Sequence, residues 1–196
     1  MNRSRVAVII SGRGSNLLAL LQAAADPAFP AGIDLVISNR PQAAGLMFAK
    51  QFNIPAQVID HTNFPDKASF EATLHDALIT AHIEWICLAG FMRILSAPFI
   101  EKWRGRILNI HPSLLPAFPG LHVHEQALAA GVKFSGCTVH YVEAGVDTGK
   151  IIDQAVVPVL PHDTAESLAA RVLEAEHMLY PAALAQIISL ANAHQV

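Results

Sequence analysis

Short hydrophobic runs alternate along the chain with longer stretches in which hydrophobic residues recur every three or four positions. The runs are bounded by turn residues, which is typical of buried parallel strands. They cover residues 6–11, 35–38, 56–60, 85–89 and 107–110. The helical spacing predicts helices over 16–25, 43–52, 69–81, 98–103 and 124–130. This alternation predicts an α/β fold with an open, mostly parallel sheet flanked by helices.

The pattern changes after Gly131. Two β-rich runs, 137–142 and 151–158, are joined by the short segment 143–150, which leaves no room for a crossover helix, so we expect a C-terminal β-hairpin. A helix should follow as far as Pro181, which breaks or kinks it, and a last helix should close the fold. The positions that face inward are Leu168, Val172, Ala175, Leu179, Leu184, Ile187 and Ile188.

Composition narrows the class of protein. A chain of 196 residues with 53% hydrophobic residues is expected to form one domain, 1–196, with a full core, and excludes overall disorder. The net charge of −3, without a basic stripe, argues against a nucleic-acid partner and favours small molecules. Cys87 and Cys137 lie in apolar runs and suit reduced core thiols. No run is long enough for a signal peptide or a membrane span, so we expect a cytoplasmic location and no membrane contact.

The first chemical motif is S-G-R-G-S-N, which follows the first predicted strand and leads into a helix with Ser15 or Asn16 as the expected N-cap. Glycines let backbone N–H groups approach an anion, and the helix N-terminus adds unpaired donors. This shape favours a phosphate site, with a plain tight turn as the alternative. Leu17 stands where a dinucleotide-binding loop needs its third glycine, and no Walker lysine follows, so neither cofactor is expected.

The second motif places Asn109 and His111 on one face at the end of a predicted strand. In open α/β sheets ligands bind beyond the carboxyl ends of strands, where the glycine-containing segment also emerges. An amide donor beside an imidazole suits a developing oxyanion and proton transfer, although a His before a Pro is often only a turn residue. Asp147, in the hairpin connection, could pair with His111 and favour its charged form.

Two other kinds of site are disfavoured. The sequence Asp147-Thr148-Gly149 is found in aspartic proteases, but those need two such carboxylates on a mostly β scaffold. The chain has 10 histidines but no H-E-x-x-H or C-x-x-C group, so we expect no metal.

Six segments together resemble the folate-dependent formyltransferases. They read SGRGSNLLALL, ISNR, LAGFMRIL, ILNIHPSLLPAFPG, HVHEQAL and GCTVHYVEAGVDTGKII, within about Val6 to Tyr180. The joint presence of N-I-H-P-S and V-D-T-G is more specific than either motif alone. The resemblance implies a Rossmann-like fold. It also implies transfer of the formyl group of 10-formyltetrahydrofolate, a co-substrate, to the amine of glycinamide ribonucleotide in purine synthesis, by a monomer or homodimer.

The resemblance also implies roles for individual residues. Asn109 and protonated His111 would stabilise a tetrahedral oxyanion, and Asp147 would keep His111 charged. The ribonucleotide would contact Gly14, Ser15, Asn16 and Glu176. The folate would contact Lys67, Met92, Arg93, Ile94, Leu95, Asn109, His140, Glu143, Ala144, Gly145 and Val146, with plain core packing as the alternative for Met92, Ile94 and Leu95. Lys67 stands where the family often has arginine, whose planar two-bond contact lysine cannot make, which puts its binding role in question.

Several rival functions share parts of this pattern. Formyltransferases that act on tRNA carry a further C-terminal β-barrel, and formyltetrahydrofolate hydrolases an N-terminal regulatory domain; we expect neither here. A nicotinamide-dependent oxidoreductase would need the third glycine and an acidic residue roughly 20 positions on. A nucleotide-binding protein without catalytic activity is a further alternative.

Overall fold

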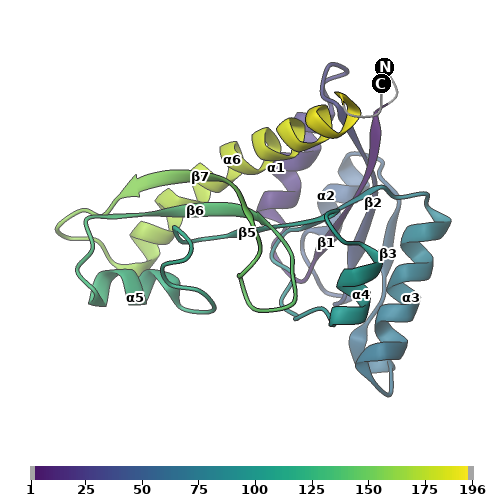
Figure 1. The fold of residues 1–196 in the computed structure, drawn as a ribbon, viewed down its shortest axis with the longest axis horizontal. Coiled ribbons are helices and arrows are strands. Elements are labelled where there is room, and N and C mark those ends of the chain that lie inside the picture. The colour runs from purple at the N-terminus through teal and green to yellow at the C-terminus, as the bar shows by residue number, and fades with distance from the viewer. Residues whose placement is uncertain (1–2, 194–196) are drawn as a thin grey trace.

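The computed structural model describes residues 3–193, which form one seven-stranded sheet covered by helices (Figure 1). The strands are β1 Ser4–Ile10, β2 Ala31–Ser38, β3 Ala56–Val58, β4 Trp85–Leu88, β5 Ile107–His111, β6 Phe134–Tyr141 and β7 Ile151–Pro158. Their order is β3-β2-β1-β4-β5-β6-β7. The first five are parallel, while β6 is antiparallel to both β5 and β7. The predicted α/β class, mostly parallel sheet and C-terminal hairpin are confirmed.

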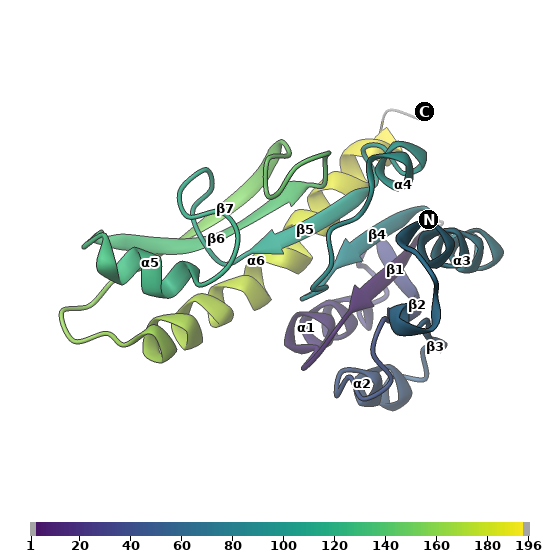
Figure 2. The same cartoon turned by 90° about the horizontal axis from the view of Figure 1, so that it is seen from below.

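The helices form a layer on each face of the sheet. They are α1 Ser15–Ala24, α2 Leu46–Gln51, the 3-10 turn η1 His61–Asn63, α3 Lys67–Thr80, α4 Ala97–Lys102, α5 Val123–Ala129 and α6 Ala165–Ala193. Side chains alternate along β1, so Val8 packs into the core under α1 and α6, whereas Ile9 packs into the core under α3 and α4. Figure 2 shows these two helix layers on opposite sides of the sheet.

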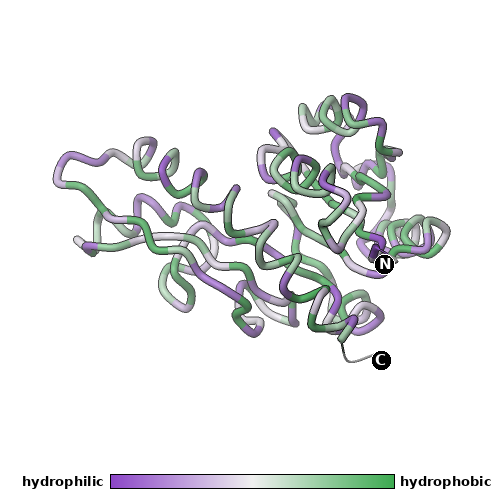
Figure 3. Tube along the Cα trace, turned by 90° about the horizontal axis from the view of Figure 1, so that it is seen from above, coloured by the Kyte–Doolittle hydropathy of each residue, from purple (hydrophilic) through white to green (hydrophobic). Residues whose placement is uncertain are grey.

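The C-terminal segment corrects one prediction. Pro181 does not break the helix into two, because α6 runs through it as one element of 29 residues. Proline removes the N–H that would bond the carbonyl of His177, a cost offset here by packing on both sides. Tyr180, Ala183 and Leu184 are all fully buried against the sheet. Hydrophilic and hydrophobic residues both recur within the turns of the helices (Figure 3), as expected for helices with one buried face.

Two elements are at least two residues shorter than predicted. β3 ends at Val58 rather than at residue 60, and all three of its residues are exposed at the edge of the sheet. α2 begins at Leu46 rather than at residue 43. The preceding Gly45 instead uses its N–H to bond the carbonyl of Gly12 at 3.0 Å, which ties this turn to the end of β1.

Tyr180 connects the C-terminal helix to the centre of the sheet. Its hydroxyl lies 3.0 Å from the carbonyl oxygens of both Leu88, the last residue of β4, and Leu108, within β5. A phenol has one proton to donate, so the two carbonyls share it. This contact joins α6 to the two neighbouring strands β4 and β5. Within residues 3–193, no helix combines the length and the apolar character needed to cross a membrane.

Candidate active site

The connection from β1 to α1 is shaped by close backbone packing. Gly14 adopts a φ of 77°, and a Cβ atom at that position would lie 2.5 Å from the Cα of Gly45. Only glycine fits such a position without displacing backbone. Gly14 is also the residue that precedes α1, and no side chain bonds the first turn, so the predicted capping by Ser15 or Asn16 is wrong. We call residues 12–16 the glycine loop.

Asn16 instead turns toward the C-terminal helix. Its amide Nδ2 donates a 2.6 Å hydrogen bond to Oε2 of Glu176, which is only 7% exposed. Burial raises the pKa of Glu176, while the Asn16 hydrogen bond and the charge of Arg13 act in the opposite direction. The buried Oδ1 of Asn16 has no hydrogen-bond partner among the described residues. A buried acceptor without a partner is costly, so this atom is suited to a donor group on a ligand.

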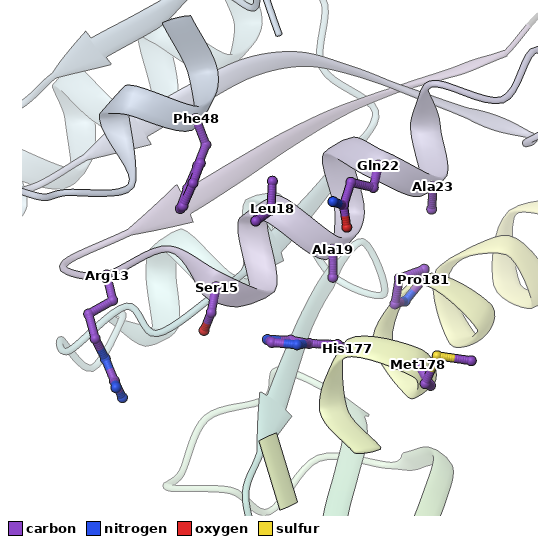
Figure 4. Close-up of a pocket in the computed structure, with 10 residues that line it drawn as sticks. All are labelled: Arg13, Ser15, Leu18, Ala19, Gln22, Ala23, Phe48, His177, Met178 and Pro181. Carbon is purple, nitrogen blue, oxygen red and sulfur yellow. The ribbon is translucent and has the colours of Figure 1, made fainter. Parts of the chain in front are cut away.

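A groove of about 440 Å³ opens beside the glycine loop (Figure 4). It lies between α1 and α6, with Phe48 of α2 on a third side. Figure 4 shows the His177 ring extending from α6 toward Ser15, and Arg13 projecting from the loop. Burial lowers the pKa of His177. The sequence pattern did not indicate Arg13 or His177, although each directly adjoins a predicted site residue.

A second group of polar residues lies where β5 and β6 are paired. Asn109 on β5 is directly opposite His140 on β6. The Asn109 amide Nδ2 lies 3.2 Å from His140 Nε2, and His140 Nδ1 lies 2.8 Å from the carbonyl of Tyr141. A carbonyl can only accept, so Nδ1 carries the proton of a neutral ring and Nε2 accepts from the amide. Burial lowers the pKa of His140, in agreement with that neutral state.

Asp147 connects this pair to His111. Its Oδ2 atom lies 3.3 Å from His111 Nδ1 and accepts a 2.9 Å hydrogen bond from the N–H of Gly120. Its Oδ1 atom lies 3.7 Å from His140 Nε2. The other nitrogen of His111, Nε2, lies 3.0 Å from the carbonyl oxygen of Phe118. A proton on each nitrogen would make His111 an imidazolium that faces a carboxylate. We call Asn109, His111, His140 and Asp147 the polar cluster.

The polar cluster lines a cleft of about 560 Å³, within the size range of small-molecule sites. The 92–95 segment forms part of its wall, as do Glu143, Gly145 and Val146. Met92 and Ile94 are each 64% exposed, whereas Leu95 is 6% exposed and packs into the core under α3 and α4. Core packing therefore describes Leu95 but neither Met92 nor Ile94.

Two predicted folate residues are not among those that line the cleft. Ala144 is absent from its wall, although its neighbours on both sides contribute. Lys67 lies at the start of α3, where its ammonium is 3.9 Å from the carboxylate of Glu71. Within the described part of the chain, no group of His, Cys, Asp or Glu is arranged to hold a metal ion.

The fold and the cleft are those of a Rossmann-like α/β enzyme, with ligand sites beyond the carboxyl ends of its parallel strands. Comparison with known proteins is more specific. The chain belongs to the formyl transferase family, because the model of that family matches residues 4–184.

Relatives of known name support the assignment. The chain is 39% identical to phosphoribosylglycinamide formyltransferase of Bacillus subtilis, over 96% of both chains. It is 56% identical to the trifunctional purine biosynthetic protein adenosine-3 of Drosophila melanogaster, over 95% of this chain and 14% of that protein. It thus spans about one seventh of the length of that relative. The crystal structure of phosphoribosylglycinamide formyltransferase from Brucella melitensis superposes with a TM-score of 0.93, at 53% identity, over 95% of this chain and 96% of the other. The predicted family and its enzymatic character are confirmed.

Proposed function

We propose that the protein transfers the formyl group of 10-formyltetrahydrofolate to the amine of N1-(5-phospho-D-ribosyl)glycinamide in purine biosynthesis. The products are the formylated ribonucleotide and tetrahydrofolate. The observation that carries this proposal is that a loop suited to phosphate and a cluster suited to an oxyanion open on one edge of the sheet. The name of the Bacillus subtilis relative agrees with it.

The ribonucleotide, as acceptor, binds at the glycine loop. The backbone N–H groups at the start of α1 lack a side-chain cap, so they are available to a phosphate. The ribonucleotide contacts Gly14, Ser15 and Asn16 there. The partnerless Oδ1 of Asn16 accepts a hydrogen bond from the ligand, and Glu176 holds the Asn16 amide in the required orientation.

The donor folate binds in the cleft. Backbone groups of the 92–95 segment read the edge of the pterin, and the exposed side chains of Met92 and Ile94 cover its face. The loop from Glu143 to Asp147 closes over the other side. Lys67 is best interpreted as a partner of Glu71, since its ammonium contacts that carboxylate rather than the cleft.

The polar cluster carries the chemistry. The acceptor amine attacks the formyl carbon, and the carbonyl oxygen becomes an oxyanion. His140 accepts one N–H of the Asn109 amide, which directs the other N–H toward the cleft, where it stabilises that oxyanion. The imidazolium of His111 adds a positive charge, which Asp147 favours. Collapse of the intermediate releases tetrahydrofolate. The amine loses one proton, N10 of the folate gains one, and no covalent enzyme intermediate forms.

Protonated His111 has both nitrogens engaged in this conformation, one by Asp147 and the other by the carbonyl of Phe118. A direct hydrogen bond from Nε2 to the oxyanion therefore requires the Phe118 carbonyl to move aside. Without that movement, the ring acts on the oxyanion through its charge alone.

The deciding experiment is a spectrophotometric assay of 10-formyltetrahydrofolate consumption, with and without the ribonucleotide. Consumption that requires the ribonucleotide supports the proposal. Consumption in its absence would instead identify a hydrolase, and no consumption in either case would contradict formyl transfer to this acceptor. We further propose that the chain acts in the cytoplasm as one domain, as a monomer or homodimer, without a metal.

A further inference from the structure

The segment that lines the donor side of the cleft is held at both ends by buried side chains from elsewhere in the fold. At its far end, the carboxylate of Glu71 accepts a 2.7 Å hydrogen bond from the N–H of Ser96. At its near end, the N–H of Met92 donates a 2.9 Å hydrogen bond to the hydroxyl oxygen of Ser11. Ser11 is 4% exposed and directly precedes the glycine loop.

The hydroxyl of Ser11 has its own buried partner. It donates a 2.6 Å hydrogen bond to Oδ1 of Asn39, which is 1% exposed at the end of β2. A hydroxyl has one proton, so its donation to Asn39 leaves a lone pair aimed at Met92. The N–H of Ser11 also donates to the carbonyl of Gly90 at 3.2 Å, which gives a second bond between the same two stretches of chain.

His61 lies against Asn39 and orients its side-chain amide when the Nδ1 atom carries no proton. Its Nδ1 lies 3.1 Å from the Asn39 Nδ2 and 3.0 Å from the Asn39 carbonyl oxygen. Without a proton, Nδ1 accepts a hydrogen bond from the Asn39 Nδ2; with a proton, it donates to the Asn39 carbonyl instead. With Nδ2 toward His61, Oδ1 of Asn39 faces Ser11, so the bonds run in one direction from Met92 through Ser11 to Asn39.

We propose that Ser11 and Asn39 are positioning residues for the formyl donor: they fix the Met92 peptide and hence the backbone groups of the 92–95 segment that contact the folate. This inference rests on the proposed function. Because Ser11 uses the Met92 N–H, that group is unavailable to the folate, and recognition falls to the peptide groups that follow it. Ser11 also connects the 92–95 segment to the glycine loop, because it bonds the Met92 N–H and directly precedes that loop in the chain.

The chain offers a matched control. Ser38 is fully buried at the end of β2, and its hydroxyl donates to the carbonyl of Arg40 at 2.7 Å and accepts from the Arg40 N–H at 3.1 Å. Ser38→Ala therefore removes two hydrogen bonds from a buried serine at the same edge of the sheet, without touching the Met92 segment.

The test compares Ser11→Ala, Ser11→Thr and Ser38→Ala in the full chain. We expect Ser11→Ala to raise KM for 10-formyltetrahydrofolate about tenfold, which corresponds to about 1.4 kcal/mol, with kcat and KM for the ribonucleotide within about twofold of the parent. Ser11→Thr keeps the hydroxyl and should restore the donor KM, and Ser38→Ala should leave it unchanged. Amide hydrogen exchange should show loss of protection at Met92 in Ser11→Ala alone.

Three results would overturn the inference. They are an unchanged donor KM in Ser11→Ala, an equal rise in Ser38→Ala, and a rise confined to the ribonucleotide. Failure of the proposed function has a different signature, because the parent protein would then show no ribonucleotide-dependent consumption of the donor. In that case the hydrogen-exchange result still decides whether Ser11 holds the Met92 peptide, and fluorescence titration with the folate decides whether that peptide serves donor binding.

Discussion

The glycine loop and the polar cluster open on the same edge of the sheet, but different forces hold them in place. The glycine loop is shaped by backbone contact, since Gly14 packs so closely on Gly45 that a single Cβ atom would collide with it. The polar cluster contains no glycine. Asn109, His111 and His140 are placed by strand pairing, and Asp147 is held by hydrogen bonds and charge from outside its own loop.

The two regions should therefore tolerate different substitutions. A change of shape should damage the glycine loop, whereas a change of charge or hydrogen-bonding capacity should damage the polar cluster. Asp147 illustrates the second case, because it adopts a φ of 54° although it is not a glycine. Such a conformation is uncommon for a residue with a side chain, and here the carboxylate contacts to Gly120 and His111 stabilise it.

The largest expected effect is loss of the amide in the polar cluster. Asn109→Ala should lower kcat roughly 100-fold or more, because it removes a donor aimed at the developing oxyanion. The measurement is steady-state turnover with both substrates saturating. A loss confined to KM would contradict this prediction and make Asn109 a binding residue only.

The second prediction concerns a substitution that changes the charge of a side chain but keeps its shape. Asp147→Asn keeps the size of the side chain but removes the negative charge beside His111, so kcat should fall on the order of 100-fold while KM for the ribonucleotide stays constant. Asp153→Asn is the control, because Asp153 is exposed on β7 and its carboxylate accepts a 2.8 Å hydrogen bond from the next N–H, that of Gln154. Equal turnover of the Asp147→Asn and Asp153→Asn variants would show that the charge is unimportant.

A third variant tests shape in the glycine loop. Gly14→Ala places a Cβ atom 2.5 Å from Gly45 and adds the cost of a left-handed conformation, about 1–2 kcal/mol. We expect the ribonucleotide KM to rise about tenfold or more and the melting temperature to fall, with folate affinity retained. In Gly12→Ala the added atom has nothing within 4 Å, so that variant should fold normally. Similar ribonucleotide affinity in the two variants would break the proposed contrast.

The sequence predicted the strands well because a buried parallel strand is a local signal. The run from Val6 to Ile10 is apolar on both faces since helices cover both, and no partner has to be known to recognise it. Asn109 and His111 could likewise be placed together, because alternation along one strand determines their common face. The continuous α6 could not be predicted from Pro181, since the packing that offsets the lost hydrogen bond comes from distant strands.

Contacts between distant segments could not be predicted from the local pattern of hydrophobic and polar residues. Ser15 or Asn16 was expected to cap the helix, yet the Asn16 amide bonds Glu176, 160 positions away in the chain. Ser11 and Asn39 are 28 positions apart, and nothing local to either indicates that they meet. For Lys67, the family resemblance indicated a substrate contact, whereas the structure provides a carboxylate one helical turn away.

The smallest expected effect concerns Glu176, a titratable residue that accepts a hydrogen bond from Asn16 of the glycine loop. Burial raises the pKa of Glu176 above its usual value of 4.5, so the folded protein holds this proton at pH values where the unfolded chain has lost it. Stability from this group is therefore fully present below the ordinary glutamate pKa and is lost as pH rises through the higher pKa of the folded state. Glu176→Gln cannot ionise and lacks this loss.

The difference in melting temperature, Glu176→Gln minus parent, should therefore increase from pH 4 to pH 8. Glu174→Gln, at an exposed position on the same helix, is the control for replacing a glutamate of α6 by glutamine. A Glu176→Gln difference that is flat across this range would mean that the Asn16 hydrogen bond and the charge of Arg13 fully compensate for burial of the carboxylate. The glycine loop would then be held by charge as firmly as the polar cluster is.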